Sequence, residues 1–197
     1  MFDTGDVIVS TKWPGHVVLI YDSKHAVHGK GVKTAASSAT DITTSKGVTR
    51  HGGFLLEEIK QEISPGRYAY LTDGQPFRFP WHKYREAEVE FYKDEIKRNA
   101  DIIRKTASYG FYRAGRLMVG DSKFGSGAAK RLLKYKSRVR GTSLDDISKA
   151  VGTITCSEAV ILTMQLTFQP GTPGFIQLDG AHTMPNTLAA WLKAHWK

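Results

Sequence analysis

The sequence predicts an α+β fold, and three observations carry that prediction. Short apolar segments separated by turn residues fill the first 30 positions, which is the pattern of strands. Segments with helical periodicity follow and dominate after residue 86. The 197 residues are 41% hydrophobic, enough for the core of one compact domain. Strands first and helices later are typical of an antiparallel sheet packed against helices.

Strands are predicted in the first third of the chain, at residues 6–10, 16–21 and 25–28, the last ending at Gly29. Two groups of turn residues separate them, Trp13-Pro14-Gly15 and Asp22-Ser23-Lys24. Residues 30–53 are rich in Ser, Thr, Gly and Ala and are expected to form a surface loop. The alternating segment 66–72, between Pro65 and Gly74, predicts one further strand.

Helices are predicted at residues 86–108, 128–135, from Ser143 onward, 156–168 and 185–196. In the first of them an apolar side is expected from Val89, Ile96, Ile102 and Ile103. The helix from residue 156 is stopped by Pro170-Gly171, and Pro185 suits an early helical position.

Composition excludes several classes of protein. No run of about 18 apolar residues occurs, so no membrane span is expected. The first residues lack a basic region followed by a long apolar one, so no cleavable signal peptide is expected. The single cysteine rules out an internal disulfide framework and a multi-cysteine zinc site.

The chain is basic, with 28 Lys+Arg against 19 Asp+Glu and a formal net charge of +9. Such a surface favours polyanions: nucleic acid, anionic lipid headgroups or acidic cell-wall polymer. The positive charge is concentrated at residues 97–140. One interpretation is a non-catalytic binding module in which Phe111, Tyr112, Phe124 and Tyr135 are interleaved with the basic residues. A solvated helical face explains the same pattern and stays open.

Cys156 is the first candidate for chemistry. Thr155 and Glu158 form a T-x-x-E capping box, which places Cys156 in the first turn of a helix. Exposed N–H groups and the helix dipole stabilise an anion there, so the thiol pKa is expected to fall. The same N–H groups can bind the oxyanion of a tetrahedral intermediate. The plainer interpretation, a buried and inert cysteine, remains open because free cysteines are commonly buried.

His16 and His28 are the candidates for a base and its partner. A hairpin centred on Asp22 places them opposite each other, and one centred on Ser23 places His28 opposite Val18, with His16 two residues away on the same face. In either geometry one imidazole can hold the other in a chosen tautomer, like the third member of a catalytic triad. Metal binding is not expected, because only two ligands would be present.

Four segments resemble a known family of enzymes. They are Gly5-Asp6-Val7-Ile8-Val9, Gly15-His16-Val17-Val18-Leu19-Ile20, Ala26-Val27-His28 and Thr155-Cys156-Ser157-Glu158. In this order they are similar to the circularly permuted NlpC-type papain-like enzymes and to the related lecithin:retinol acyltransferase-like branch. The stretch from Met184 to Ala189 resembles the Pro-x-x-Leu segment that follows the cysteine helix in permuted members.

The resemblance implies a single permuted papain-like domain over residues 1–197, with a basic helical insertion at about 86–140. It implies that Cys156 is the nucleophile, His16 the base and His28 the residue orienting His16, with no cofactor. Trp13 and Tyr21 are candidates to line a substrate groove, and Asp6 to brace the first strand near His16. Plain packing is the better explanation of each of these last three.

The expected activity is a thiol hydrolase that cleaves an amide bond in peptidoglycan stem peptides. The expected setting is an antibacterial toxin or effector, carried by a contact-dependent system such as type VI secretion into the periplasm of a rival cell. An immunity protein and a secretion carrier would then be partners, and nucleic acid is not favoured. Acyl transfer or thioester hydrolysis on lipids remains an alternative, as does proteolysis or deamidation of a host protein.

Overall fold

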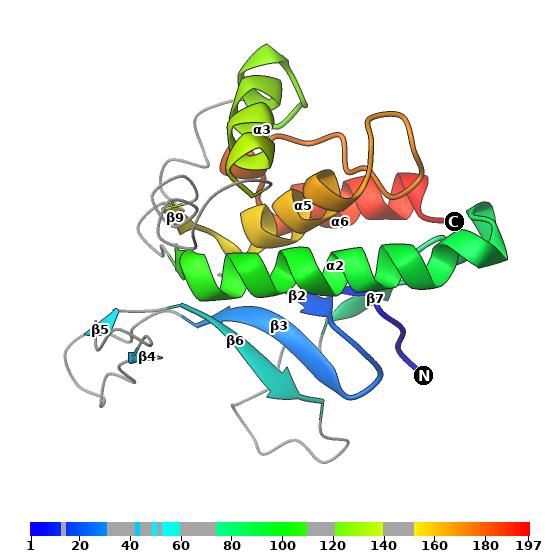
Figure 1. Ribbon diagram of the computed structural model, residues 1–197, viewed down its shortest axis with the longest axis horizontal. Helices are drawn as coiled ribbons and strands as arrows, with labels where there is room; N and C mark the ends of the chain where they lie inside the picture. The colour runs from blue at the N-terminus through cyan, green and yellow to red at the C-terminus, as the bar shows by residue number, and fades with distance from the viewer. Residues whose placement is uncertain are drawn as a thin grey trace.

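The computed structural model describes residues 1–12, 15–30, 42–43, 49–50, 53–59, 74–109, 121–139 and 152–197 (Figure 1). Its main sheet has five antiparallel strands in the order β6-β3-β2-β1-β7. The strands are β1 (Val7–Ser10), β2 (His16–Ile20), β3 (His25–Lys30), β6 (Gly53–Glu58) and β7 (Gln75–Phe77). The predicted α+β class is confirmed at this level.

The hairpin of β2 and β3 fixes the register of the two histidines. Val18 pairs with His28, so the hairpin centres on Ser23, as in the second of the two predicted geometries. The Asp22 carboxylate accepts hydrogen bonds from the backbone N–H groups of Lys24 and His25, each at 2.7 Å. An aspartate that satisfies two turn amides explains why the chain reverses at this point.

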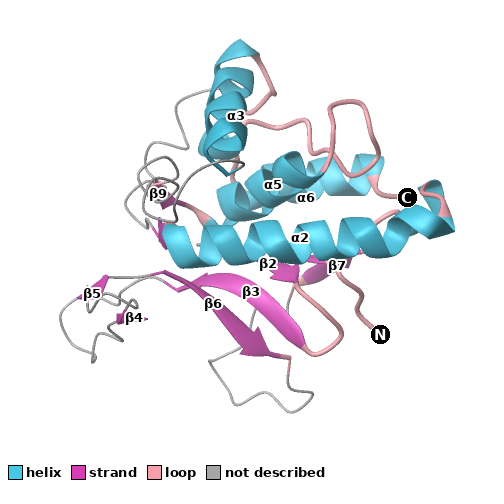
Figure 2. Cartoon of the chain, in the orientation of Figure 1, coloured by secondary structure: helices cyan, strands magenta, loops and turns pink. Residues whose placement is uncertain are grey.

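Four helices are present in the described part of the chain: α2 (Glu86–Thr106), α3 (Ser126–Val139), α5 (Cys156–Thr167) and α6 (Pro185–His195). All four were predicted, with bounds that differ by a few residues. Figure 2 shows α2, α5 and α6 on one side of the sheet, with α3 projecting beyond them. The fold therefore has two layers, one of strands and one of helices.

The main core fills the space between these two layers. Val17 and Leu19 of β2 face Ile96 and Ile103 of α2 and the apolar side of α5, and all are buried. The opposite face of the sheet carries a smaller cluster of Ile8, Val18, Ile20 and Ala26. This alternation is the period-two pattern of strands, with both faces apolar. One core thus joins residues from Val7 to Trp196.

Several elements differ from the predictions. Strands β6 and β7 were not predicted, and β3 continues through Lys30. Two further ladders, each of two-residue strands, are β4 (Ile42–Thr43) with β5 (Thr49–Arg50) and β8 (Ser108–Tyr109) with β9 (Thr153–Ile154). The first lies within the predicted loop at residues 30–53. The strand predicted at 66–72 and the helix predicted from Ser143 lie outside the described residues.

The segment at about 86–140, predicted to be an insertion, contributes to the core. Ile96, Ala100 and Ile103 of α2 are buried among the strands and α5. Of the predicted apolar side, Val89 and Ile102 are only partly buried. No helix in the described ranges is long and apolar enough to cross a bilayer.

Candidate functional site

Cys156 is the first residue of α5, where the sequence predicted it. The Thr155 hydroxyl accepts a hydrogen bond from the Glu158 backbone N–H at 3.2 Å, so Thr155 is the N-cap. Strand β9 ends at Ile154 and delivers the chain directly to this cap. The first turn of α5 leaves backbone N–H groups without partners inside the helix, and the cysteine lies among them.

Several donors surround the Cys156 sulfur. They include the backbone N–H of Val17, the hydroxyl of Tyr109 and the backbone N–H of Ser157. Val17 directly follows His16, so the nucleophile candidate meets β2 one peptide bond from the base candidate. The structure therefore joins the start of β2 and the start of α5, which are far apart in the sequence.

Burial raises the pKa of the Cys156 thiol, and the hydrogen bonds from Val17, Tyr109 and Ser157 oppose that rise only in part. The prediction that the helix terminus lowers this pKa is therefore wrong. The reason is that Cys156 is only 5% exposed. The free energy required to remove a thiolate from water exceeds the stabilisation that the helix N-terminus gives the anion. At neutral pH the resting group is the protonated thiol.

The two histidines form a connected pair with a carboxylate. The rings of His16 and His28 meet edge to face, with centroids 5.6 Å apart and planes at 82°. His28 Nε2 lies 3.0 Å from Glu57 Oε2 on β6. His28 is buried, whereas Glu57 is partly exposed. A carboxylate that holds one imidazole, which in turn contacts another, fixes the orientation of both rings.

His16 is neutral at physiological pH. Burial, followed by the nearby His28, lowers its pKa from 6.5 to about 3. A neutral imidazole can accept a proton, which a base requires. The start of α5 thus carries a thiol and the start of β2 a neutral imidazole, and the ring contact of this imidazole is with His28.

A small cavity lies beside the sulfur. Its volume is about 10 Å³, room for about one water molecule. Cys156, Val17 and His28 contribute to its wall, together with apolar residues of the core such as Phe54 and Ile103. The cysteine and the second histidine therefore line the same small cavity.

Two of the three residues proposed for substrate contact, Asp6 and Tyr21, do not lie at this site. Asp6 lies beside Ile20, at the other end of β1 and β2 from His16. Its buried carboxylate accepts hydrogen bonds from the backbone N–H of Phe79 and from the Arg78 guanidinium, so it braces the strand but not near His16. Tyr21 donates to Asp101 Oδ2 at 3.3 Å. Trp13 lies outside the described residues.

Sequence reasoning missed two residues of the site, Tyr109 and Glu57. Glu57 belongs to β6 (Gly53–Glu58). Two glycines followed by the apolar residues Phe54, Leu55 and Leu56 are a sequence signal for a strand at this place. Tyr109 follows a 21-residue helix, and nothing in its neighbours distinguishes it. Only the tertiary fold brings it to Cys156.

No cluster of three or more His, Cys, Asp or Glu residues suited to a metal ion occurs in the part of the chain that the structure describes. Comparison with family models, with curated proteins and with solved structures finds no match to this chain. The resemblance to permuted NlpC-type enzymes therefore stays a prediction, and so do the catalytic roles of Cys156, His16 and His28.

Proposed function

We propose that this protein is a cysteine hydrolase of permuted papain-like fold that cleaves an amide bond. One observation carries the proposal. The Cys156 sulfur lies against the backbone amide of Val17, the residue that follows His16, and the ring of His16 contacts that of His28, which Glu57 holds. A thiol at a helix N-terminus and a neutral imidazole attached one residue from its amide partner are the two groups that thiol-dependent acyl chemistry uses, and the proposed reaction needs the His16 ring to turn to the sulfur.

The reaction begins when His16 removes the Cys156 proton while the sulfur bonds to the substrate carbonyl carbon. Backbone N–H groups at the start of α5 supply hydrogen bonds to the oxyanion. The carbon–nitrogen bond breaks, and the imidazolium gives its proton to the leaving amine. Water, deprotonated by His16, then attacks the thioester, and the sulfur recovers its proton as the acid leaves.

Peptidoglycan stem peptides are the proposed substrate, in an antibacterial setting. The net charge of +9 favours an anionic polymer, and stem peptides carry both amide bonds and carboxylates. Helix α3 concentrates this charge, because no acidic residue occurs between Ser126 and Val139. The alternative function, acyl transfer, proceeds through the same thioester and differs only in the molecule that accepts the acyl group.

The test incubates the purified full-length protein with peptidoglycan fragments and identifies new termini by mass spectrometry. Cys156→Ala is expected to abolish cleavage, and His16→Ala to lower its rate roughly 10²- to 10⁴-fold, the usual contribution of a general base. His195→Ala, on the exposed end of α6, serves as a histidine control and should retain full activity.

Two outcomes would contradict parts of the proposal. Equal cleavage by the wild type and by folded Cys156→Ala would remove the thiol mechanism. Turnover of thioester substrates without any cut in stem peptides would shift the function to the acyl branch.

A further inference from the structure

Tyr109 is held next to Cys156 by the backbone. It is the second residue of β8, and it pairs in parallel with Ile154 of β9. Ile154 lies two residues before Cys156 and leads into the cap of α5. This short ladder fixes the origin of the Tyr109 side chain relative to the nucleophile candidate, although the two residues are far apart in sequence.

The Tyr109 ring lies directly on the backbone of β3. A Cβ atom added to Gly29 would stand 2.2 Å from Tyr109 Cδ2 and 2.3 Å from Cε2, far inside van der Waals contact. The ring also meets Phe54 edge to face, with centroids 5.7 Å apart. Only glycine at position 29 lets the phenol lie this close to the strand.

The Tyr109 hydroxyl reaches the Cys156 sulfur and forms a hydrogen bond with it. Burial, then the adjacent Cys156, raises the pKa of Tyr109, so the phenol keeps its proton and acts as the donor. A hydrogen bond donated to sulfur favours the thiolate over the thiol. Because the site is buried, this hydrogen bond stabilises the thiolate more strongly than it would in water.

We propose that Tyr109 is a catalytic residue whose hydroxyl donates to the Cys156 sulfur and makes the buried thiol ionisable. The role rests on the proposed function, in which His16 accepts the thiol proton. Tyr109 retains its own proton throughout, and its hydrogen bond to sulfur weakens once the thioester removes the negative charge. Val17 supplies a second donor, which a side-chain substitution cannot remove.

The experiment measures the rate of iodoacetamide alkylation of the full-length protein against pH. Tyr109→Phe keeps the ring on Gly29 and removes only the hydroxyl. The apparent pKa of the alkylation profile is expected to rise by about one unit, a tenfold change in the ionisation equilibrium and the weight of one hydrogen bond to a charged group. The rate of amide cleavage should fall about as much.

Tyr84→Phe is the matched control. The Tyr84 hydroxyl also takes part in a hydrogen bond in the interior, accepting from the Gly174 backbone N–H at 2.7 Å, but it lies in an aromatic cluster with Phe79 and Phe168. Its removal should leave the alkylation profile unchanged, even if it lowers the melting temperature.

Gly29→Ala tests the same contact from the other side, since the new methyl group must displace the Tyr109 ring. The profile should move as in Tyr109→Phe, and the double variant should shift no further than the larger single change. If Gly29→Ala does not fold, Tyr109→Phe decides alone. An unchanged profile in folded Tyr109→Phe overturns the proposal, whatever happens to activity.

The alkylation assay needs no substrate, so the two proposals fail separately. A shifted profile without cleavage of stem peptides supports the role of Tyr109 and rejects that substrate. Cleavage with an unshifted profile supports the hydrolase and rejects the role of Tyr109.

Discussion

Burial governs the chemistry of both His16 and Cys156. It lowers the pKa of the imidazole and raises that of the thiol, so both groups are uncharged in the resting protein. Papain-like chemistry can also begin from a thiolate and an imidazolium, but that state is disfavoured here because two charges would be removed from water. In the proposed reaction a proton must therefore move during the attack on the carbonyl.

The depressed pKa of His16 predicts how stability depends on pH. The unfolded chain binds a proton at His16 below about pH 6.5, whereas the folded protein does so only near pH 3. Stability from this group is thus fully present above pH 6.5 and lost progressively as the pH falls toward 3. Urea unfolding of the wild type and of His16→Gln between pH 7 and pH 4 checks this.

His16→Gln should show the shallower loss of stability with acid. Parallel curves for the two proteins would mean that folding does not lower the pKa of His16. Other groups that titrate in the same range affect both proteins alike, so the difference between the curves isolates His16.

The spacing of the two histidines was predictable, and their third partner was not. A turn of known residues fixes the register of two adjacent strands, so positions 16 and 28 had to lie near each other. Glu57 comes from β6, which pairs with β3 although 22 residues, 31–52, separate the two strands in the sequence. Local pattern cannot supply such a long-range pairing, and the same holds for Tyr109.

At the level of elements, prediction worked best for helices with caps and breakers. The capping residue Thr155 and the stop at Pro170-Gly171 located α5 almost to the residue. Pro185 marked the start of α6 in the same way. Two-residue strands such as β8 and β9 have no periodicity to read, because their existence depends on tertiary contact rather than on local preference.

The pairing of β3 with β6 brings His28 and Glu57 into contact, and substitution of these two residues tests the role of that contact. Glu57→Gln should lower the rate of amide cleavage roughly tenfold, the effect of one hydrogen bond to a charged group. His28→Ala should give a partial loss of similar size. The double variant should lose no more than the larger single change, because the two residues act as a unit.

Asp22 and His25 supply the control for this experiment. They form the same kind of contact, 3.0 Å between Asp22 Oδ1 and His25 Nδ1, on the same hairpin but at an exposed turn. Asp22→Asn should leave the cleavage rate unchanged. A full sum of losses in the Glu57 and His28 double variant would argue against a connected pair.

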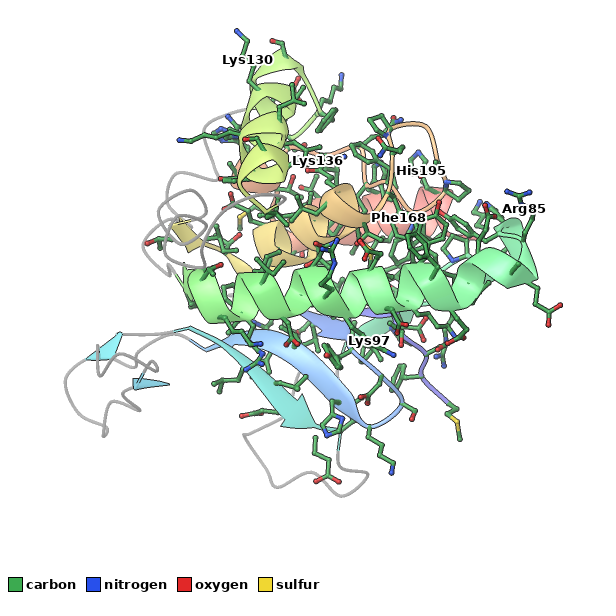
Figure 3. All side chains as sticks on the ribbon, in the orientation of Figure 1. Arg85, Lys97, Lys130, Lys136, Phe168 and His195 are labelled. Carbon is green, nitrogen blue, oxygen red and sulfur yellow. The ribbon has the colours of Figure 1, made fainter. Side chains whose placement is uncertain are left out.

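Over the whole molecule, positive charge is distributed unevenly between two helices. Basic residues of α2 are paired with acids three positions earlier, as in Lys97 with Asp94 and Arg98 with Glu95. Helix α3 has no acid of its own, and its Arg131 pairs with Asp179, which lies between α5 and α6. Figure 3 shows Lys130 at the outer tip of α3. Of these two helices, α3 therefore carries the larger net positive charge.

This asymmetry predicts that polyanion binding depends on α3 and on salt. Lys130→Glu with Lys134→Glu should elute from a heparin column at lower salt than the wild type. Lys97→Glu with Arg98→Glu on α2 is matched in charge: each pair lowers the formal net charge by 4, from +9 to +5. Equal elution of the two variants would show that total charge, not its location, decides binding.

Helix α6 packs against the connection between β1 and β2. Pro185 packs against Gly15: a Cβ atom added to Gly15 would lie only 3.0 Å from the Cγ of Pro185. Gly15 also has a positive φ of 76°, which favours glycine at this position. The end of the chain thus sits against the residue preceding His16. Nucleophile and base candidates come from opposite ends of one polypeptide, 140 positions apart (156 − 16).

During translation this arrangement sets an order of events. The strand with His16 leaves the ribosome early, the turn with Cys156 late, and the helix that locks onto Gly15 last. A nascent chain therefore cannot bring the candidate residues together before α5 has been synthesised. By the same logic the protein is divisible: a fragment ending before α5 holds the imidazole, and the remainder holds the thiol. Neither piece alone carries both groups, and only their reassociation restores the pair.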